Sequence, residues 1–385
     1  MKKGTTILAI ETSCDDTGIS IVKSGSGKDP AFSVLANIVS SQIEVHKKWG
    51  GVYPMLAKRE HQKNLVPVLE KALRQSRLLN KNAKKNTADQ ALKKILERED
   101  KLHKMLKVFL ARYEKPKIDA IAVTTGPGLE PCLWVGVNFA KALSHTWNIP
   151  IIAVNHVKAH IFVNTLKANS LEELKKENFP AICLIVSGGH TQLFLMEDFG
   201  KYKILGETRD DAAGECFDKV AKILKLGYPG GPIISKLARQ RKQFSIKLPR
   251  PMMNTKDYDF SFSGLKTAAL YNFKKAKKSK EYIAEMCAET QQAIVDVLLK
   301  KTIKAAKNFK AKTIILGGGV VANDELRKRF KEKINTMIPR PSLLIPDKDL
   351  CTDNALMIAI AGYFRFRQRK IEKWENIEAN ANLKF

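Results

Sequence analysis

The 385-residue sequence has no apolar stretch long enough to cross a membrane. Its longest apolar runs, such as Ala355–Phe364, reach about half of the ~20 residues that a transmembrane helix requires. No secretory apolar segment precedes the first predicted strand, which begins at Thr5 directly after Met1-Lys2-Lys3. We therefore expect no membrane partner, and either a cytosolic protein or one whose targeting segment has been removed.

Cysteine is sparse and unpaired in sequence. The six cysteines stand at positions 14, 132, 183, 216, 287 and 351, and no C-x-x-C pair occurs. This spacing excludes a zinc ribbon and a thioredoxin-type site. Single cysteines inside apolar strands are typical of reduced, buried residues, so we expect a fold without disulfides.

Acidic residues are few relative to basic ones. The sequence has 67 Lys and Arg against 39 Asp and Glu, a net charge of +28. Such a protein attracts polyanions, with nucleic acid as the leading partner and anionic lipid as the second. The 44% of apolar and 28% of charged residues are ordinary for a globular protein. The length predicts two lobes or one duplicated domain.

The two best-known phosphate-binding motifs are also missing. The sequence contains neither G-x-x-x-x-G-K-[ST] nor a G-x-G-x-x-G after a strand, which argues against P-loop and dinucleotide-binding folds. Four other glycine-rich turns border predicted strands, and backbone N–H groups in such turns can hold anions, although glycine also makes purely structural turns. These turns lie at Thr125–Gly128, Ser187–His190, Tyr228–Gly231 and Gly317–Gly319.

Two halves of the sequence share one pattern. Ile7–Val22 and Ala181–Met196 both read as β-hairpins, and at a constant offset Ser13 meets Ser187 while Thr17 meets Thr191. A buried strand, a helix and a short strand follow in each half, at 118–128, 135–147 and 151–154, and at 312–319, 324–334 and 343–345. The repetition predicts two lobes, each a mixed sheet covered by helices, with a cleft between them. We place the first lobe at 1–178 plus 353–385 and the second at 179–352.

One basic segment interrupts this repetition. Residues 71–117 carry fifteen Lys and Arg against five Asp and Glu. Apolar residues recur at helical spacing in Ala91–Leu110, which predicts a basic helical insertion at about 76–117 of the first lobe. It is either a solvated surface helix or an arm that binds phosphates. A second basic cluster is found at Arg365–Lys370.

Two histidines have metal-ligand spacing. His156 and His160, at i and i+4, share one face of a helix, which suits one metal ion. A zinc protease needs Glu directly after the first His, and Val157 stands there, so a metalloprotease is disfavoured. A third ligand must come from elsewhere. Asp353, just ahead of the last apolar helix, is the candidate, with helix capping as its alternative role.

Carboxylates cluster beside the glycine turns. Glu11, Asp15 and Asp16 flank the first hairpin turn, and the Asp210–Glu215 cluster with Asp218 is expected to precede a helix. These groups suit hydroxyl recognition, metal coordination or proton transfer. Helix capping by Asp210 or Asp211 is the alternative.

Seven blocks of sequence, taken together, resemble one family, the tRNA threonylcarbamoyladenosine transferases, long mislabelled as O-sialoglycoprotein endopeptidases. In order, the blocks are IETSCDDTGISIV, NHVKAHIF, VSGGHTQL, DDAAGECFDKVAKILKLGYPGGP, FSFSGLKTA, GGGVVANDELR and CTDNALMIA. The resemblance implies a duplicated α/β fold of the actin, sugar-kinase and Hsp70 type, with two RNase H-like lobes. It also implies transfer of a threonylcarbamoyl group from threonylcarbamoyl-AMP to N6 of the adenosine next to the anticodon, in tRNAs that read codons beginning with A.

The resemblance assigns residues to roles. It implies that His156, His160 and Asp353 bind one divalent metal ion per subunit, either iron or zinc. Glu11 is the candidate for an essential catalytic carboxylate, while the general base stays unassigned. The expected contacts to the adenylate are Ile185, Val186, Ser187, Gly188, Gly189, Asp218, Gly231 and Asn323.

The sequence also departs from bacterial members of that family. Its basic segment is longer than the connection expected there, and its charge is higher. Both features favour the mitochondrial branch, which implies a removed or truncated transit peptide, a homodimer, and a separate synthase that supplies threonylcarbamoyl-AMP. A bacterial cytoplasmic protein is the alternative.

Two other classes of function stay open at this point. An ATP-dependent kinase or nucleotide switch of the same superfamily would not need the histidine pair. A non-enzymatic nucleic-acid scaffold would bind RNA through charge alone, and its binding would be indifferent to substitution of His156 or Asp353.

Overall fold

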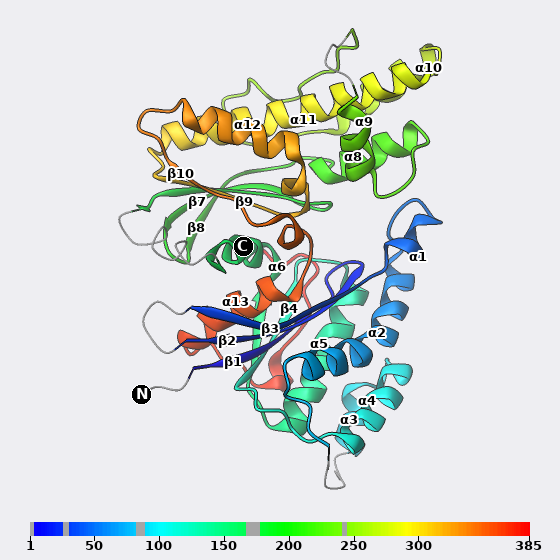
Figure 1. Cartoon of the computed structure of the whole chain (residues 1–385), viewed down its shortest axis with the longest axis vertical. Helices are drawn as coiled ribbons and strands as arrows, with labels where there is room; N and C mark the ends of the chain where they lie inside the picture. Colours follow the sequence, from blue (N-terminus) through cyan, green and yellow to red (C-terminus); the bar gives the residue numbers. More distant parts are fainter. Residues whose placement is uncertain (1–3, 26–30, 82–88, 167–177, 241–244) are drawn as a thin grey trace. The chain divides into compact units, whose positions relative to one another are not determined.

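The computed structural model describes residues 4–25, 31–81, 89–166, 178–240 and 245–385. The chain divides into two compact units, each described by itself below (Figure 1). The first unit comprises Met1–Val45, Val52–Leu166 and Asp353–Phe385, and the second comprises His46–Gly51 and Lys167–Thr352.

The first unit is built on a mixed five-stranded sheet of order β3-β2-β1-β4-β5. β1, β2 and β3 are antiparallel neighbours, whereas β4 is parallel to β1 and β5 is parallel to β4. Every residue of β1 and β4 is buried, as expected for strands with both faces covered. The strands are β1 (Thr6–Glu11), β2 (Asp16–Ser24), β3 (Phe32–Ser41), β4 (Ala120–Gly126) and β5 (Ile151–Asn155).

Helices cover both faces of this sheet. α2 (Pro54–Gln75) and α5 (Glu130–Trp147) share a core with Leu8 and Val123. Because side chains alternate along a strand, Ala122 points to the other face. There α13 (Ala355–Arg367) comes so close that a Cβ on Gly362 would lie 2.5 Å from that of Ala122. The remaining short elements are α1 (Ile43–Lys47), α6 (His156–Phe162), η1 (Val163–Leu166) and η5 (Trp374–Asn376).

The basic segment between α2 and β4 contains two helices, α3 (Asp89–Ile95) and α4 (Asp100–Arg112). The apolar face of α4 is buried and the helix contacts α2. The two ends of this basic segment lie side by side. Lys81 pairs with Tyr113 in a β-bridge, and the Glu114 N–H donates to the Asn80 carbonyl at 3.0 Å. Residues 82–88 of this segment lie outside the described part.

The second unit repeats the sheet of the first. Its order, β10-β9-β6-β7-β8, has β6, β7 and β8 antiparallel and β9 and β10 parallel, as in β1 to β5. The predicted duplicated α/β fold with two mixed sheets is thereby confirmed. The third strand of each sheet was not predicted, because β3 and β8 are half-exposed and polar residues interrupt their apolar ones. The strands are β6 (Ala181–Val186), β7 (Thr191–Asp198), β8 (Lys201–Glu207), β9 (Thr313–Gly317) and β10 (Ser342–Leu344).

Helices of the second unit pack around one apolar core, through which the 29-residue α11 runs. Among the described residues, no helix is both long and apolar enough to cross a bilayer. The helices are α8 (Ala213–Ile223), α9 (Gly230–Ala238), α10 (Ser263–Lys275), α11 (Lys280–Asn308), η3 (Gly319–Ala322), α12 (Asp324–Asn335) and η4 (Lys348–Leu350).

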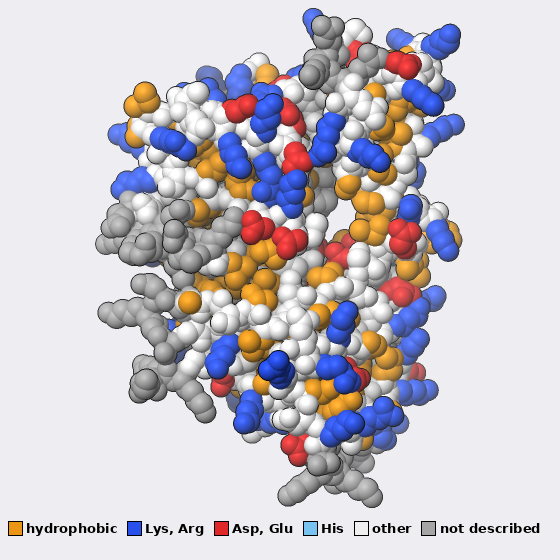
Figure 2. All heavy atoms as spheres, viewed as in Figure 1, with side chains coloured by type: hydrophobic (Ala, Val, Ile, Leu, Met, Phe, Trp, Pro, Cys, Tyr) orange, Lys and Arg blue, Asp and Glu red, His pale blue; other side chains and the backbone are white. Residues whose placement is uncertain are grey.

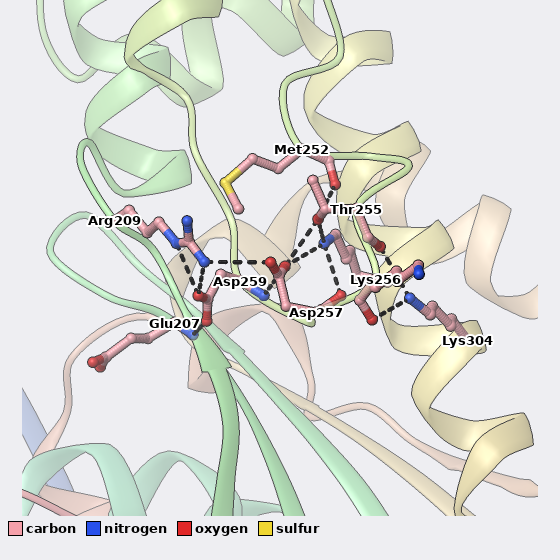
Figure 3. Close-up of polar contacts among 9 residues, drawn as sticks. Glu207, Arg209, Met252, Thr255, Lys256, Asp257, Asp259 and Lys304 are labelled. Atoms are coloured by element: carbon pink, nitrogen blue, oxygen red, sulfur yellow. Dashed lines mark hydrogen bonds and ion pairs between the residues drawn. The ribbon is translucent and has the colours of Figure 1, made fainter.

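The irregular segment 245–262, which precedes α10, is held by ion pairs and hydrogen bonds (Figure 3). Arg209, just after β8, pairs with Asp257 at 3.3 Å and with Asp259 at 2.8 Å. The fully buried Lys301 of α11 donates to the hydroxyl of Thr255 at 2.7 Å and to the carboxylate of Asp257 at 3.1 Å. The segment is therefore attached to a strand end and to a helix.

All six cysteines are free thiols. Five are buried and Cys14 is partly buried. Burial raises the pKa of Cys132 and of Cys287 to about 12, so both thiols stay protonated and unreactive at neutral pH.

Candidate metal centre and nucleotide site

The predicted histidine pair lies at the carboxyl end of β5. His156 is the first residue of α6, and His160 follows one turn later on the same face. The helix starts here because the side chain of Asn155 accepts a hydrogen bond from the Lys158 N–H at 3.0 Å. A buried strand and a capped helix therefore fix both imidazoles.

Asp353 reaches the same place from the far end of the chain. It lies just before α13, whose cap is the neighbouring Asn354, because the Asn354 side chain accepts from the Met357 N–H at 3.1 Å. The alternative role predicted for Asp353, helix capping, therefore belongs to Asn354. Since α13 contacts α6, the carboxylate of Asp353 faces the two histidines.

The three side chains form a compact set of metal-ligand atoms. Oδ1 of Asp353 lies 3.4 Å from Nε2 of His156 and 3.4 Å from Nε2 of His160. Ligand atoms of the three residues all lie within 4.8 Å of one another. Two ligands at ~2.1 Å from one ion in tetrahedral geometry are about 3.4 Å apart, so these separations suit a single ion.

His160 supplies a second argument for a metal. Its side chain is fully buried, yet among the described residues Nδ1 has no hydrogen-bond partner, and Nε2 has only the 3.4 Å approach of the Asp353 carboxylate. A buried polar nitrogen without a partner is costly. A cation bound through Nε2 would give that nitrogen a partner, so these residues fit a metal ion.

Glu11, the last residue of β1, lies behind His156 rather than among the ligand atoms. Its Oε2 accepts from the Thr124 hydroxyl at 2.6 Å and lies 3.2 Å from Nδ1 of His156. Its Oε1 accepts from the Ser13 N–H at 2.6 Å, and the Ser13 hydroxyl lies 3.2 Å from the same Nδ1. Contacts of this kind orient a metal-binding imidazole and leave its Nε2 for the ion.

The charges of this cluster shift its pKa values. Burial lowers the pKa of His156, but Asp353 and Glu11 outweigh burial and raise that pKa to about 9. Burial raises the pKa of Glu11, but the charge and hydrogen bond of His156 overcome it and leave the pKa lowered. Burial lowers the pKa of His160. The cluster thus holds one positive charge against two carboxylates, and a divalent cation replaces that proton when it binds.

His61 supports this centre and was not singled out in the sequence. It is fully buried on α2, where Nδ1 lies 2.8 Å from the Thr17 hydroxyl and Nε2 lies 2.9 Å from the Cys14 carbonyl oxygen. It therefore holds the turn between β1 and β2, which carries Ser13. A lone histidine on a helix gives no pattern by which to find it, and the same is true of Ser13 and Thr124.

The predicted adenylate segment, residues 185–189, spans the end of β6 and the turn before β7. The Ser187 N–H donates to the His190 carbonyl at 2.8 Å, and the Ser187 hydroxyl accepts from the His190 N–H at 3.1 Å. Cβ atoms added to Gly188 and Gly189 would meet nothing within 4 Å. The turn is rigid, and its backbone is open to a ligand.

The other predicted adenylate contacts surround this turn within the second unit. Gly318 has φ +93°, and a Cβ there would lie 2.4 Å from the Val186 carbonyl oxygen. Asn323 caps α12 through the Leu326 N–H at 3.0 Å and donates to Gln291 at 2.7 Å. Since η3 contacts both β6 and α8, the structure brings residues 185–189, Gly318, Asn323 and α8 together at the carboxyl ends of β6 and β9.

Asp218 joins the same group from α8. We predicted it before a helix, but it lies inside α8, where its Oδ1 accepts from the Gly230 N–H at 2.7 Å. Gly231 follows, and a Cβ there would meet nothing within 4 Å. Asp218 therefore connects the start of α9 to α8 beside a partly exposed glycine.

The acidic cluster next to α8 has mainly structural partners. Asp210 accepts from the Phe262 and Ser263 N–H groups at 2.8 and 3.2 Å, and so caps α10 rather than the helix that follows it in sequence. Asp211 pairs with Lys219 at 2.6 Å and with Lys266 at 2.8 Å. Helix capping was the predicted alternative role of Asp210. The helix that it caps, α10, was not expected.

The fold has relatives among solved structures. A full-length HypF structure in a phosphate- and nucleotide-bound form aligns with a TM-score of 0.54 and 13% identity, over 97% of this chain and 57% of that chain. HypF from T. kodakarensis gives a TM-score of 0.54 at 11% identity, over 95% and 48% of the two chains. With the duplicated mixed sheets, this likeness defines the class of fold: a duplicated α/β protein in which each unit is built on a five-stranded mixed sheet.

The family follows from the sequence. The family model of the tRNA N6-adenosine threonylcarbamoyltransferases matches residues 33–84 and 99–360, and the chain belongs to this family. The tRNA N6-adenosine threonylcarbamoyltransferase of Thermosipho africanus is 43% identical over 98% of this chain and 99% of its own. That of Bacillus cereus strain ATCC 14579 is 41% identical over 96% and 94%. The predicted family is therefore confirmed, and the match skips residues 85–98, where α3 lies.

Proposed function

We propose that this chain transfers the threonylcarbamoyl group of threonylcarbamoyl-AMP to N6 of adenosine 37, in tRNAs that read codons beginning with A. One observation carries the proposal. A chain of this family places His156, His160 and Asp353 around one point, with ligand atoms that all lie within 4.8 Å of one another. Modification of tRNA is the activity of the family. The donor, threonylcarbamoyl-AMP, and the target atom, N6 of adenosine 37, are what we propose for this chain.

His156, His160 and Asp353 would hold one divalent metal ion, iron or zinc, which would polarise the carbonyl of the threonylcarbamoyl group as a Lewis acid. Asp353 is the most exposed of the three, with 24% of its side chain accessible, so the substrate would approach past it. The histidines are fixed by α6 and by the contacts of Glu11.

Glu11 acts through His156 in this proposal. Both of its carboxylate oxygens already accept hydrogen bonds, from the Ser13 N–H and from Thr124, and it is fully buried. These contacts favour a positioning role over proton transfer. The general base stays unassigned.

The second unit would bind the adenylate. Within the segment Ile185–Gly189, the backbone N–H groups of Gly188 and Gly189 would face the phosphate or the nucleoside, because no side chain shields these two glycines. Asp218 would accept hydrogen bonds from ribose hydroxyls beside Gly231. Asn323, whose side-chain amide both caps α12 and bonds Gln291, would position the turn after Gly317–Gly319 rather than bind directly.

The reaction needs no nucleophile from the protein. The N6 amine of adenine attacks the carbamoyl carbon, the bond from that carbon to the phosphate oxygen breaks, AMP leaves with the bonding pair, and N6 releases one proton. Orientation of the two substrates is the main task of the protein, and such orientation supplies much of a rate enhancement.

Supply, assembly and location are part of the proposal as well. We expect a separate synthase to supply threonylcarbamoyl-AMP, and a homodimer. The relatives named above are bacterial, which supports the bacterial cytoplasm, the earlier alternative, over the mitochondrial matrix.

A reconstitution tests the proposal. The purified chain is mixed with a threonylcarbamoyl-AMP synthase, bicarbonate, threonine, ATP, a divalent metal and a tRNA that reads an A-initial codon. The tRNA is then digested, and threonylcarbamoyladenosine is sought by mass spectrometry. We expect product with the parent and none with His160→Ala. His145→Ala, which removes a partly exposed histidine of α5 that packs on Trp374, is the matched control and should keep activity.

The outcomes separate the remaining alternatives. Product with the chain alone supports a self-sufficient homodimer, whereas product only after bacterial partner subunits are added keeps the chemistry and rejects that assembly. Activity that survives His160→Ala rejects the metal assignment. ATP hydrolysis without modified tRNA would favour the nucleotide switch.

A further inference from the structure

The outer face of α4 is basic. Lys101, Lys104, Lys107 and Arg112 are all exposed on it, over about 16 Å of helix. Among the described residues, Lys101, Lys104 and Arg112 form no ion pair. Figure 2 shows Lys and Arg side chains gathered over α2 and α4. Lys101, Lys104 and Arg112 therefore attract anions without first having to break a salt bridge.

A groove of about 430 Å³ lies between α2 and α4 under these cations. This volume lies in the range of small-ligand sites. Its floor and walls are apolar or aromatic, and Lys104 and Arg112 stand on its rim. Val108, at 50% exposure, is the most open of its apolar side chains. The apolar lining consists of Val66, Pro67, Met105, Val108, Phe109 and Tyr113.

One end of the groove combines an aromatic wall with polar atoms. The rings of Phe109 and Tyr113 lie 5.0 Å apart. The Tyr113 hydroxyl donates to Glu70 at 2.9 Å, and Arg74 pairs with the same carboxylate oxygen at 2.8 Å. Glu70 is thus neutralised, so it does not repel an anion from Arg112.

We propose that this groove binds one unstacked nucleobase of an RNA, with the flanking phosphates on Lys104 and Arg112. Single-stranded RNA is recognised by this combination, an apolar or aromatic surface for a base and cations for the backbone. The inference rests on the proposed function, because it takes tRNA as the polyanion. It adds a site outside the reacting centre, next to the segment 85–98 that the family match skips.

The dimensions of the groove favour a nucleotide over a protein helix. An amphipathic helix docks through anchors at i, i+3, i+4 and i+7 along a continuous apolar groove. Here the lining draws on little more than one turn of α2, from Val66 to Glu70, and on α4 from Lys104 onward. Cations precede and follow the apolar floor. The apolar part therefore suits one planar group with charge on both sides.

Fluorescence anisotropy with labelled tRNA and the full chain tests the phosphate contacts. K104Q/R112Q should weaken tRNA binding about tenfold at near-physiological salt. It should also reduce the slope of log Kd against log salt by about 1.4, the value for two phosphate contacts on a single strand. K201Q/K203Q, which removes the same charge from the exposed side of β8, is the control and should change both quantities little. Equal effects of the two double variants would overturn the proposal.

Substitutions of Val108 test the base contact. V108D and V108K both place a charged group over the groove, on an exposed position where folding is unaffected. If a base enters the groove, both variants weaken tRNA binding several-fold, and both reduce the preference for tRNA over an RNA duplex of equal length. If the surface attracts phosphates only, V108K binds more tightly than the parent, and the proposal fails. Groove variants that all bind tRNA like the parent would point to another occupant, such as an acidic peptide, and would also overturn it.

The same variants separate this inference from the proposed function. K104Q/R112Q should raise KM for tRNA in the transfer assay and leave kcat unchanged, whereas His160→Ala should abolish transfer and bind tRNA like the parent. If K104Q/R112Q transfers normally with an unchanged KM for tRNA, the nucleobase site is rejected and the proposed function stands. If the parent shows no transfer but its tRNA binding still depends on the groove residues, the proposed function is rejected and the nucleobase site stands.

Discussion

Single residues near the metal centre work through the partners that they hold. Glu11 is fully buried, and its hydrogen bonds to Ser13 and Thr124 keep it aimed at Nδ1 of His156. Asp353 faces the histidines, while its neighbour Asn354 caps α13. The arrangement of the three ligand atoms thus depends on residues that do not touch the ion.

We expect Glu11→Gln to weaken metal binding 10- to 100-fold, the usual cost of losing an orienting carboxylate. The new amide would also present N–H groups to the Ser13 N–H or the Thr124 hydroxyl, which both donate in the parent. Competition titration with a chelator measures the affinity. Thr125→Val, which alters the next residue along β4 without touching Glu11, should bind metal like the parent. Equal affinity in Glu11→Gln would show that Glu11 does not orient His156.

Asp16, at the start of β2, gives the protein a pH-dependent stability. Burial raises the pKa of its carboxyl to about 7, with Asp15 adding to the shift and the hydrogen bond from Ser41 opposing it. The unfolded chain has the ordinary pKa of about 3.9. Between these two values the folded protein holds a proton that the unfolded chain has released. The free energy of unfolding therefore falls as the pH rises from about 4 to about 7.

Asp16→Asn removes this titration. We expect its free energy of unfolding to lack the decline between about pH 4 and pH 7, which in the parent is on the order of 2–4 kcal/mol. Urea unfolding at several pH values measures it. A decline of the same size in the variant would mean that another group is responsible.

Elements of the second unit are held in place by long-range polar contacts as well as by the apolar core. Lysines of α11 hold the segment between α9 and α10, since Lys301 donates to Thr255 and Asp257 while Lys304 donates to the Thr255 carbonyl at 3.0 Å (Figure 3). Asp210 then caps α10 from the other side. The position of α10 therefore depends on residues distant in sequence.

Two neighbouring lysines provide a matched test of this attachment. Lys301→Met keeps the buried aliphatic volume but loses three hydrogen bonds, so we expect a loss of about 1–3 kcal/mol in the free energy of unfolding. Lys300→Met loses only an exposed contact to Asn254 and should cost less than about 0.5 kcal/mol. Urea unfolding at neutral pH compares them. Similar losses in both variants would contradict the attachment.

At the scale of the whole molecule, a net charge of +28 accompanies two units with the same sheet order. The charge attracts RNA at long range but also repels itself in the compact state. In the first unit the metal centre and Glu11 bring together β1, β5, α6 and the start of α13. A bound cation at that point links α6 to the residue just before α13.

Metal removal should therefore be visible in global stability. At 100 times its dissociation constant, a ligand stabilises the folded state by about 2.7 kcal/mol. An unfolding entropy of about 2.1 cal/mol/K per residue gives about 0.8 kcal/mol/K for 385 residues, so we expect a chelator to lower the thermal midpoint by about 3 °C. The His160→Ala protein should show no shift with the chelator. Equal shifts in both proteins would reject the cluster as the metal site.

The local sequence determined the repeated part of the molecule. Fully buried strands such as β4, β6 and β9 are predicted by their apolar runs, and a hairpin turn is predicted by the few residues that form it. The spacing of His156 and His160 similarly predicts one shared helix face. The half-exposed strands β3 and β8 escaped prediction because they carry no such pattern.

Only the tertiary structure decided which distant residues meet. Nothing local to Asp353 shows that α13 packs on the first sheet beside α6, or that Asn354 takes the cap and leaves Asp353 for the histidines. The same holds for Glu11 behind His156, and for Asp210, which caps a helix some fifty residues later. Periodicity encodes burial of a segment, whereas the pairing of polar groups depends on how the sheets and helices pack, and that packing is a property of the whole chain.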